Sequence, residues 1–73
     1  MPHINIKHFP LLSEEQHIAL AKSITEAVTK VVGCDESVIS IAVEPVEPEL
    51  WNEQVYIPEI VERKDTLIKI PNY

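Results

Sequence analysis

The opening residues, PHINIKHF, alternate between side chains that would face opposite sides of a strand. Ile4 and Ile6 fall on one face, whereas Asn5 and Lys7 fall on the other. An alternation of this length predicts a half-buried β-strand over Pro2–Phe9.

The next stretch changes to a helical period. Apolar residues recur three and four positions apart, at Ile18, Ala21, Ile24, Ala27, Val28 and Val31. Ser13 is a good N-cap, and Gln16 three residues later completes a capping box. Gly33, the only glycine, stands where a left-handed C-cap would end the helix. The pattern therefore predicts a helix of about five turns between these two residues.

The third segment, Val38–Glu44, reads VISIAVE and is β-branched and nearly all apolar. Such a run predicts a strand covered on both faces. Strand, helix and strand form a β-α-β unit, whose right-handed crossover makes the two strands parallel. We therefore expect an α/β (α+β) fold.

The remainder of the chain is rich in proline. Pro45 and Pro48 should end the second strand, because proline has no N–H for a sheet. Pro58 can occupy the first turn of a helix, and Pro71 would stop that helix. We expect a short C-terminal helix near residues 58–69.

These elements make one domain over residues 1–73, too small to close a core alone. Two parallel strands have two unpaired edges. Domains of this size usually add disulfides, a metal or association, but there is one cysteine and no metal-binding spacing. The sequence therefore predicts a homo-oligomer in which another subunit completes the sheet.

The charge balance narrows the possible partners. Six Lys and Arg against twelve Asp and Glu give a net charge of −6, which argues against nucleic acid and against an anionic membrane surface. No signal peptide or membrane-spanning run is present. A lone cysteine fits a reducing compartment, so we expect a cytoplasmic protein.

Pro2 is the candidate for chemistry. We expect Met1 to be removed, which would turn the Pro2 nitrogen from a tertiary amide into a secondary amine. An ordinary α-amino group has a pKa of about 8, and burial in an apolar pocket lowers this value. The result would be a base poised near neutral pH, although a proline that merely begins a strand is the simpler interpretation of this residue alone.

The order of several other stretches favours the catalytic interpretation of Pro2. The chain resembles the 4-oxalocrotonate tautomerase family, in particular its phenylpyruvate-type bacterial members, over essentially its whole length. The resemblance rests on the stretches Pro2–Pro10, Ile39–Ala42, Pro48–Trp51 and Leu67–Tyr73. It implies a cofactor-independent keto–enol tautomerase, without a metal, that acts on a 2-keto acid or its enol with Pro2 as general base.

The remaining site residues follow from the same resemblance. Founding members carry arginines at the positions of Leu12 and Ser40, and neither residue here can clamp a carboxylate. This departure favours a substrate with one carboxylate and an apolar tail, such as phenylpyruvate. Trp51 matches an aromatic residue of the family's pocket, and Phe9 matches an apolar position that lines it. For Trp51, ordinary packing is an equally good interpretation. For Phe9, ordinary packing is the better one.

Three questions stay open at this point. Lys7, Arg63, Lys64, Lys69, a partner subunit or backbone N–H groups could each hold the substrate carboxylate. The resemblance favours a homodimer over a hexamer. The missing arginines leave an alternative function, a catalytically weak homo-oligomeric binding module on the same fold.

Overall fold

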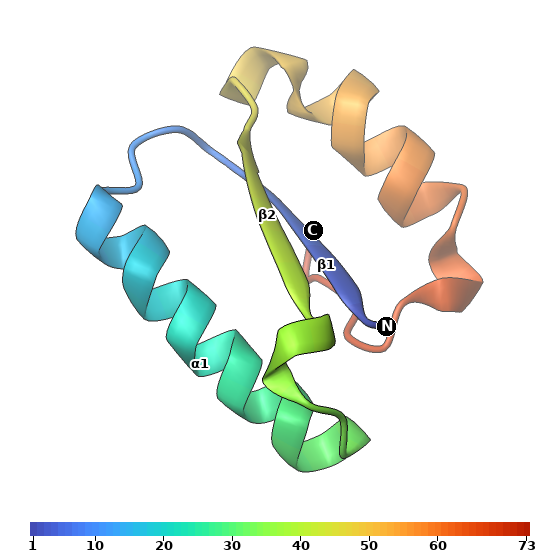
Figure 1. The fold of residues 1–73 in the computed structure, drawn as a ribbon. Coiled ribbons are helices and arrows are strands. Elements are labelled where there is room, and N and C mark those ends of the chain that lie inside the picture. Colours follow the sequence, from blue (N-terminus) through green and yellow to red (C-terminus); the bar gives the residue numbers. More distant parts are fainter.

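The computed structural model describes every residue from Met1 to Tyr73. Its two strands, β1 (His3–His8) and β2 (Ser40–Pro45), pair in parallel, with His3 opposite Ser40 and His8 opposite Pro45. The helix α1 (Glu14–Val32) connects them and runs along one side of the strand pair (Figure 1). The predicted β-α-β unit with parallel strands is therefore confirmed.

Both ends of α1 are fixed by the residues that the sequence indicated. The Ser13 hydroxyl accepts the Gln16 N–H at 3.1 Å, and the Gln16 side chain accepts the Ser13 N–H at 2.8 Å. At the other end Gly33 has a φ of 81° and donates its N–H to the Thr29 carbonyl at 3.0 Å. A side chain would be strained at this φ, so the helix ends at the only glycine of the chain.

The short C-terminal helix exists, but its position was predicted wrongly. A 3-10 turn, η2 (Pro48–Leu50), leads through Trp51 into η3 (Asn52–Val61), whose turns are π-helical. Pro48 begins this helical segment, whereas Pro58 lies inside η3. A proline inside an α-helix clashes with the carbonyl four residues earlier, and the wider i to i+5 turns give its ring more room. Beyond η3 only a 3-10 turn, η4 (Lys64–Thr66), follows.

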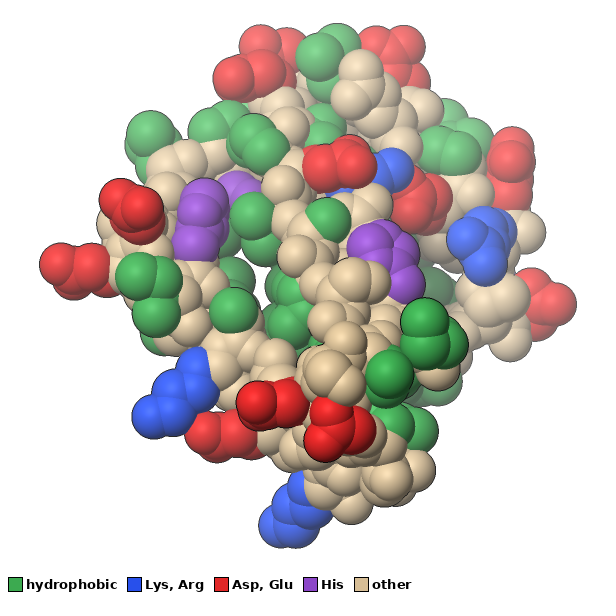
Figure 2. Space-filling model, in the orientation of Figure 1, with side chains coloured by type: hydrophobic (Ala, Val, Ile, Leu, Met, Phe, Trp, Pro, Cys, Tyr) green, Lys and Arg blue, Asp and Glu red, His purple; other side chains and the backbone are tan.

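The single protomer has almost no core. Only Val46 and Val55 are buried, each 6% exposed. Hydrophobic side chains are spread over the face of the molecule that Figure 2 shows, and Leu11 and Ile68 are almost fully exposed. The covering of β2 on both faces that its sequence predicts is absent within one protomer, where its residues are half-buried or exposed.

The exposed area shows how much covering is missing. A compact monomer of 8.3 kDa would expose about 4,600 Å². The protomer exposes 5854 Å², a surplus of about 1,300 Å² over that expectation. The open strand edges and this surplus fit a sheet that is completed in an oligomer. None of the helices combines the length and the apolar composition that a bilayer crossing requires.

Candidate functional site

Pro2 lies directly before β1 and is half-buried. Its carbonyl accepts the Ser40 N–H at 3.2 Å, which anchors the residue to the start of β2. The ring and the carbonyl together keep the Pro2 nitrogen close to the head of β1. Met1 before it is 97% exposed, so its removal would cost no packing.

Ser40 and Leu12, the positions that the resemblance matches to arginines of founding members, make structural contacts in this protein. The Ser40 hydroxyl lies 2.6 Å from Nδ1 of His3, its partner across the strand pair, and forms a hydrogen bond with it. Leu12 is half-buried and lines a shallow pocket against the first turns of α1, together with Gln16 and Leu20. Both side chains therefore have structural contacts within the protomer.

Phe9 and Trp51 meet in an aromatic cavity. Their rings are in edge-to-face contact with centroids 5.2 Å apart, a favoured geometry for aromatic pairs. Together with Tyr73 they line a cavity of about 480 Å³. The indole Nε1–H of Trp51 donates to the Tyr73 hydroxyl at 3.2 Å. We did not predict Tyr73 as a site residue. The one indication in the sequence was that Tyr73 ends the stretch Leu67–Tyr73, on which the family resemblance partly rests.

The predicted site residues therefore form two groups. Pro2 and Ser40 lie together at the beginning of the strands, whereas Phe9 and Trp51 lie together beyond the other end of β1. Phe9 is seven positions after Pro2 in extended chain, a distance of about 23 Å. One small substrate cannot touch both groups within a single protomer.

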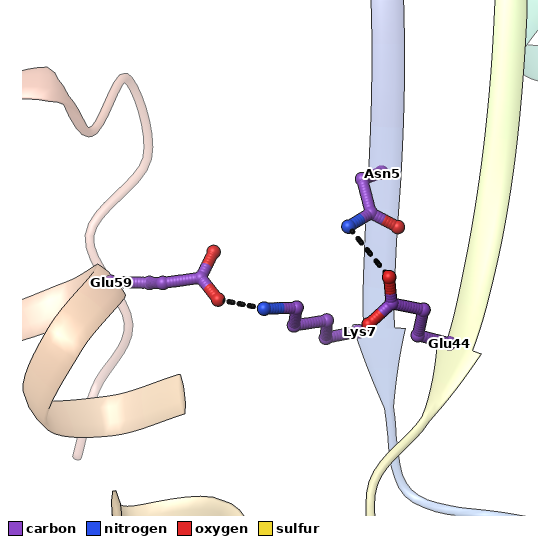
Figure 3. A network of polar contacts seen from close by, with 4 residues as sticks. All are labelled: Asn5, Lys7, Glu44 and Glu59. Carbon is purple, nitrogen blue, oxygen red and sulfur yellow. Dashed lines mark hydrogen bonds and ion pairs between the residues drawn. The ribbon is translucent and has the colours of Figure 1, made fainter. Parts of the chain in front are cut away.

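None of the three residues that line the aromatic cavity carries a positive charge. Lys7 on β1 forms an ion pair with Glu59 on η3, while Asn5 donates to Glu44 on β2 at 3.3 Å (Figure 3). The hydrogen bond with Glu59 raises the pKa of Lys7, against a smaller opposing effect of desolvation. Lys64 lines a second cavity of about 340 Å³ beside the C-terminal segment.

The chain offers little for a metal ion. No three side chains among His, Cys, Asp and Glu come close enough to share one. His3 bonds to Ser40, and Nδ1 of His8 donates to the Phe9 carbonyl at 2.5 Å. The polar and aromatic groups that the structure brings together are thus the Tyr73 phenol and the rings of Phe9 and Trp51 in one group, and the Pro2 carbonyl with Ser40 in the other.

Comparisons with known proteins agree with this arrangement. The family model described as "Tautomerase enzyme" matches residues 2–56. Among curated proteins, "Tautomerase PptA" of Cronobacter sakazakii is 42% identical over 74 aligned positions, which cover 100% of this chain and 97% of the relative. The proteins of the same name from Pectobacterium atrosepticum and Escherichia coli (strain SMS-3-5) are 40% and 43% identical, with the same coverage.

Proposed function

The chain belongs to the tautomerase family and is an isomerase, and we propose that it interconverts the keto and enol forms of a 2-keto acid such as phenylpyruvate, with the Pro2 amine as general base. The family match begins at Pro2 and not at Met1, which supports an active chain that starts at the proline. The relatives' printed name says tautomerase and gives no substrate. The substrate class is inferred from the aromatic cavity and from the two missing arginines.

The reaction needs only one group that can both accept and return a proton. In the ketonisation direction, the Pro2 amine removes the proton of the enol O–H, and the resulting ammonium protonates the neighbouring C3 carbon. The C2–C3 double bond becomes the C2=O double bond, so no electron leaves the substrate and no cofactor is required. Proton transfer by a positioned group contributes about 10²- to 10⁴-fold to a rate.

The observation that carries the proposal is the placement of Pro2. Its carbonyl is tied to Ser40 and its nitrogen is closed into a ring on its own Cα, so the nitrogen is kept near the head of β1 and has far fewer conformations than a lysine amine. A base held in this way loses little entropy when the substrate arrives. An apolar surrounding would also disfavour the charged ammonium form of this amine.

The complete site requires a second copy of the chain. Pro2 and the aromatic cavity lie at opposite ends of β1, and the protomer has unpaired strand edges and exposed apolar side chains. We expect a homodimer in which Pro2 of one copy lies beside Trp51 and Phe9 of the other, rather than a hexamer. A single free cysteine, Cys34, fits a cytoplasmic location.

Two measurements test the catalytic premise. An intact-mass spectrum should show that the purified protein lacks Met1. An ultraviolet assay of phenylpyruvate enol–keto conversion should then show activity in the wild type and the loss of most of it in Pro2→Ala. A chain with an additional N-terminal residue that is not removed is the matched control, because it keeps the proline ring but makes its nitrogen a non-basic amide.

The controls separate enzyme from binding module. Both altered chains should keep the wild-type circular dichroism and oligomer mass. Equal rates in all three proteins would contradict the role of Pro2. An inactive wild type that still binds aryl carboxylates would favour the binding module, the alternative that the missing arginines leave open.

A further inference from the structure

The hydroxyl of Tyr73 is the one polar side-chain group of the aromatic cavity whose proton is not used within the protomer. We propose that this hydroxyl donates a hydrogen bond to the carboxylate of an aryl 2-keto acid, and so orients the substrate whose ring packs against Trp51 and Phe9. The proposal deepens the proposed function and rests on it. The family match covers residues 2–56 and therefore does not reach Tyr73.

The hydrogen bonding of the cavity leaves this donor free. A phenol can accept and donate, whereas an indole N–H can only donate. The Trp51 Nε1–H gives its hydrogen to the Tyr73 oxygen at 3.2 Å, so the indole has no further donor for a ligand. This bond also polarises the phenol, because chains of hydrogen bonds strengthen one another. The Tyr73 O–H remains available to an anion.

Tyr73 is held in place from two directions. Besides its bond with Trp51, its ring lies against that of Tyr56, with centroids 5.7 Å apart and planes tilted by 35°. The side chain is 66% exposed, so its hydroxyl is open to a ligand. A donor that is already positioned loses less entropy on binding than a mobile lysine would.

The distribution of charge favours a carboxylate that is bound by a neutral donor. Only Phe9, Trp51 and Tyr73 line the cavity, and Lys7 is already paired with Glu59. Lys64 lies in the neighbouring cavity, which shares Tyr73 with this one, and not in the aromatic cavity itself. Binding sites of this kind combine apolar walls with a few placed polar groups. Hydrogen bonds to an ionised acceptor are about twice as strong as neutral ones, so one phenol suffices to orient a monoanion.

The test compares Tyr73→Phe with Tyr56→Phe, a change that removes a hydroxyl from the neighbouring ring outside the cavity. We expect Tyr73→Phe to raise the KM for phenylpyruvate enol about tenfold to a hundredfold while kcat stays nearly constant, equivalent to about 1.4 to 2.8 kcal/mol. Tyr56→Phe should leave both constants unchanged. A split between KM and kcat is the sign of lost binding, not of lost chemistry.

A direct binding measurement makes the test independent of turnover. Trp51 is the only tryptophan, so its fluorescence reports ligands in the cavity. Benzoate should lose affinity for Tyr73→Phe by the same factor as the KM changes, whereas benzyl alcohol, which has no charge, should bind the variant and the wild type alike.

Each outcome has one meaning. Equal benzoate affinity in Tyr73→Phe and wild type overturns the inference, as does an equal loss in both variants or an equal loss for benzyl alcohol, because these would indicate packing. An inactive wild type with a selective benzoate loss in Tyr73→Phe would overturn the proposed tautomerase reaction but uphold Tyr73 as the carboxylate donor.

Discussion

Dilution should unfold this protein. Two protomers that cover their surplus exposed area would bury about 2,600 Å² together, which lies in the range of obligate homodimers. Only two residues of 73 are buried within one protomer. A separated protomer should therefore not persist as a folded species, and dissociation and unfolding should occur as one transition whose midpoint depends on concentration.

The size of the effect follows from the length of the chain. Each tenfold dilution removes about 1.4 kcal/mol from the stability of a dimer. With an unfolding entropy of about 2.1 cal/mol/K for each of 73 residues per copy, the Tm should fall by about 5 °C per tenfold dilution of a dimer. The same reasoning gives about 8 °C for a hexamer, since five associations are lost per six chains.

Thermal melts followed by circular dichroism over a wide concentration series measure this slope, and analytical ultracentrifugation of the same samples gives the mass. A reducing agent is needed throughout, because a disulfide between Cys34 side chains of two copies would conceal dissociation. A Tm that does not change with concentration, together with the mass of a folded single chain, would refute the inference from exposed area. A slope near the hexamer value would refute the expected dimer.

Three further changes test local features. Leu11→Asn should stabilise the protein by about 1 kcal/mol in thermal melts, because asparagine tolerates the φ of 83° better than leucine, whereas Leu11→Val should destabilise it. Ser13→Ala should lower the urea midpoint by the equivalent of about 1 kcal/mol through loss of the capping box, while Ser23→Ala, exposed on the same helix, should not. The hydrogen bond from the Ser37 side chain lowers the pKa of Asp35 below its ordinary value of 3.8. The ionised Asp35 therefore contributes its full stabilisation above pH 3.8 and loses it as the pH falls below that value. Asp35→Asn should weaken this acid dependence in thermal melts at several pH values.

The parts of the fold that the sequence predicted well are those with local signals. The capping box at Ser13 and the left-handed position of Gly33 act within one turn of helix, so they bound α1 correctly. We expected the C-terminal helix to begin at Pro58, whereas the helical segment begins at Pro48 and accommodates Pro58 inside η3 because its turns are π-helical. Nothing in the local pattern indicates such turns.

The site was harder to predict because its residues meet over long sequence separations. Pro2 and Ser40 are neighbours only because the crossover sets the register of β1 against β2. Trp51 and Tyr73 are 22 positions apart, and they meet because the last residues after η4, which form no helix or strand, bring Tyr73 back to Trp51. Sequence patterns report helix and strand periods, and they carry no information on how such a segment returns to an earlier element.

Two of the polar groups that could have bound a second carboxylate have partners within the protomer. Glu59 neutralises Lys7, and His3 holds the Ser40 hydroxyl. The net charge of −6 also repels a dianion more strongly than a monoanion. The Tyr73 phenol can satisfy one carboxylate, and the adjoining aromatic surface has no polar group left for another. On the proposed function, we therefore expect ring packing in the aromatic cavity, and not charge at positions 12 and 40, to select the substrate.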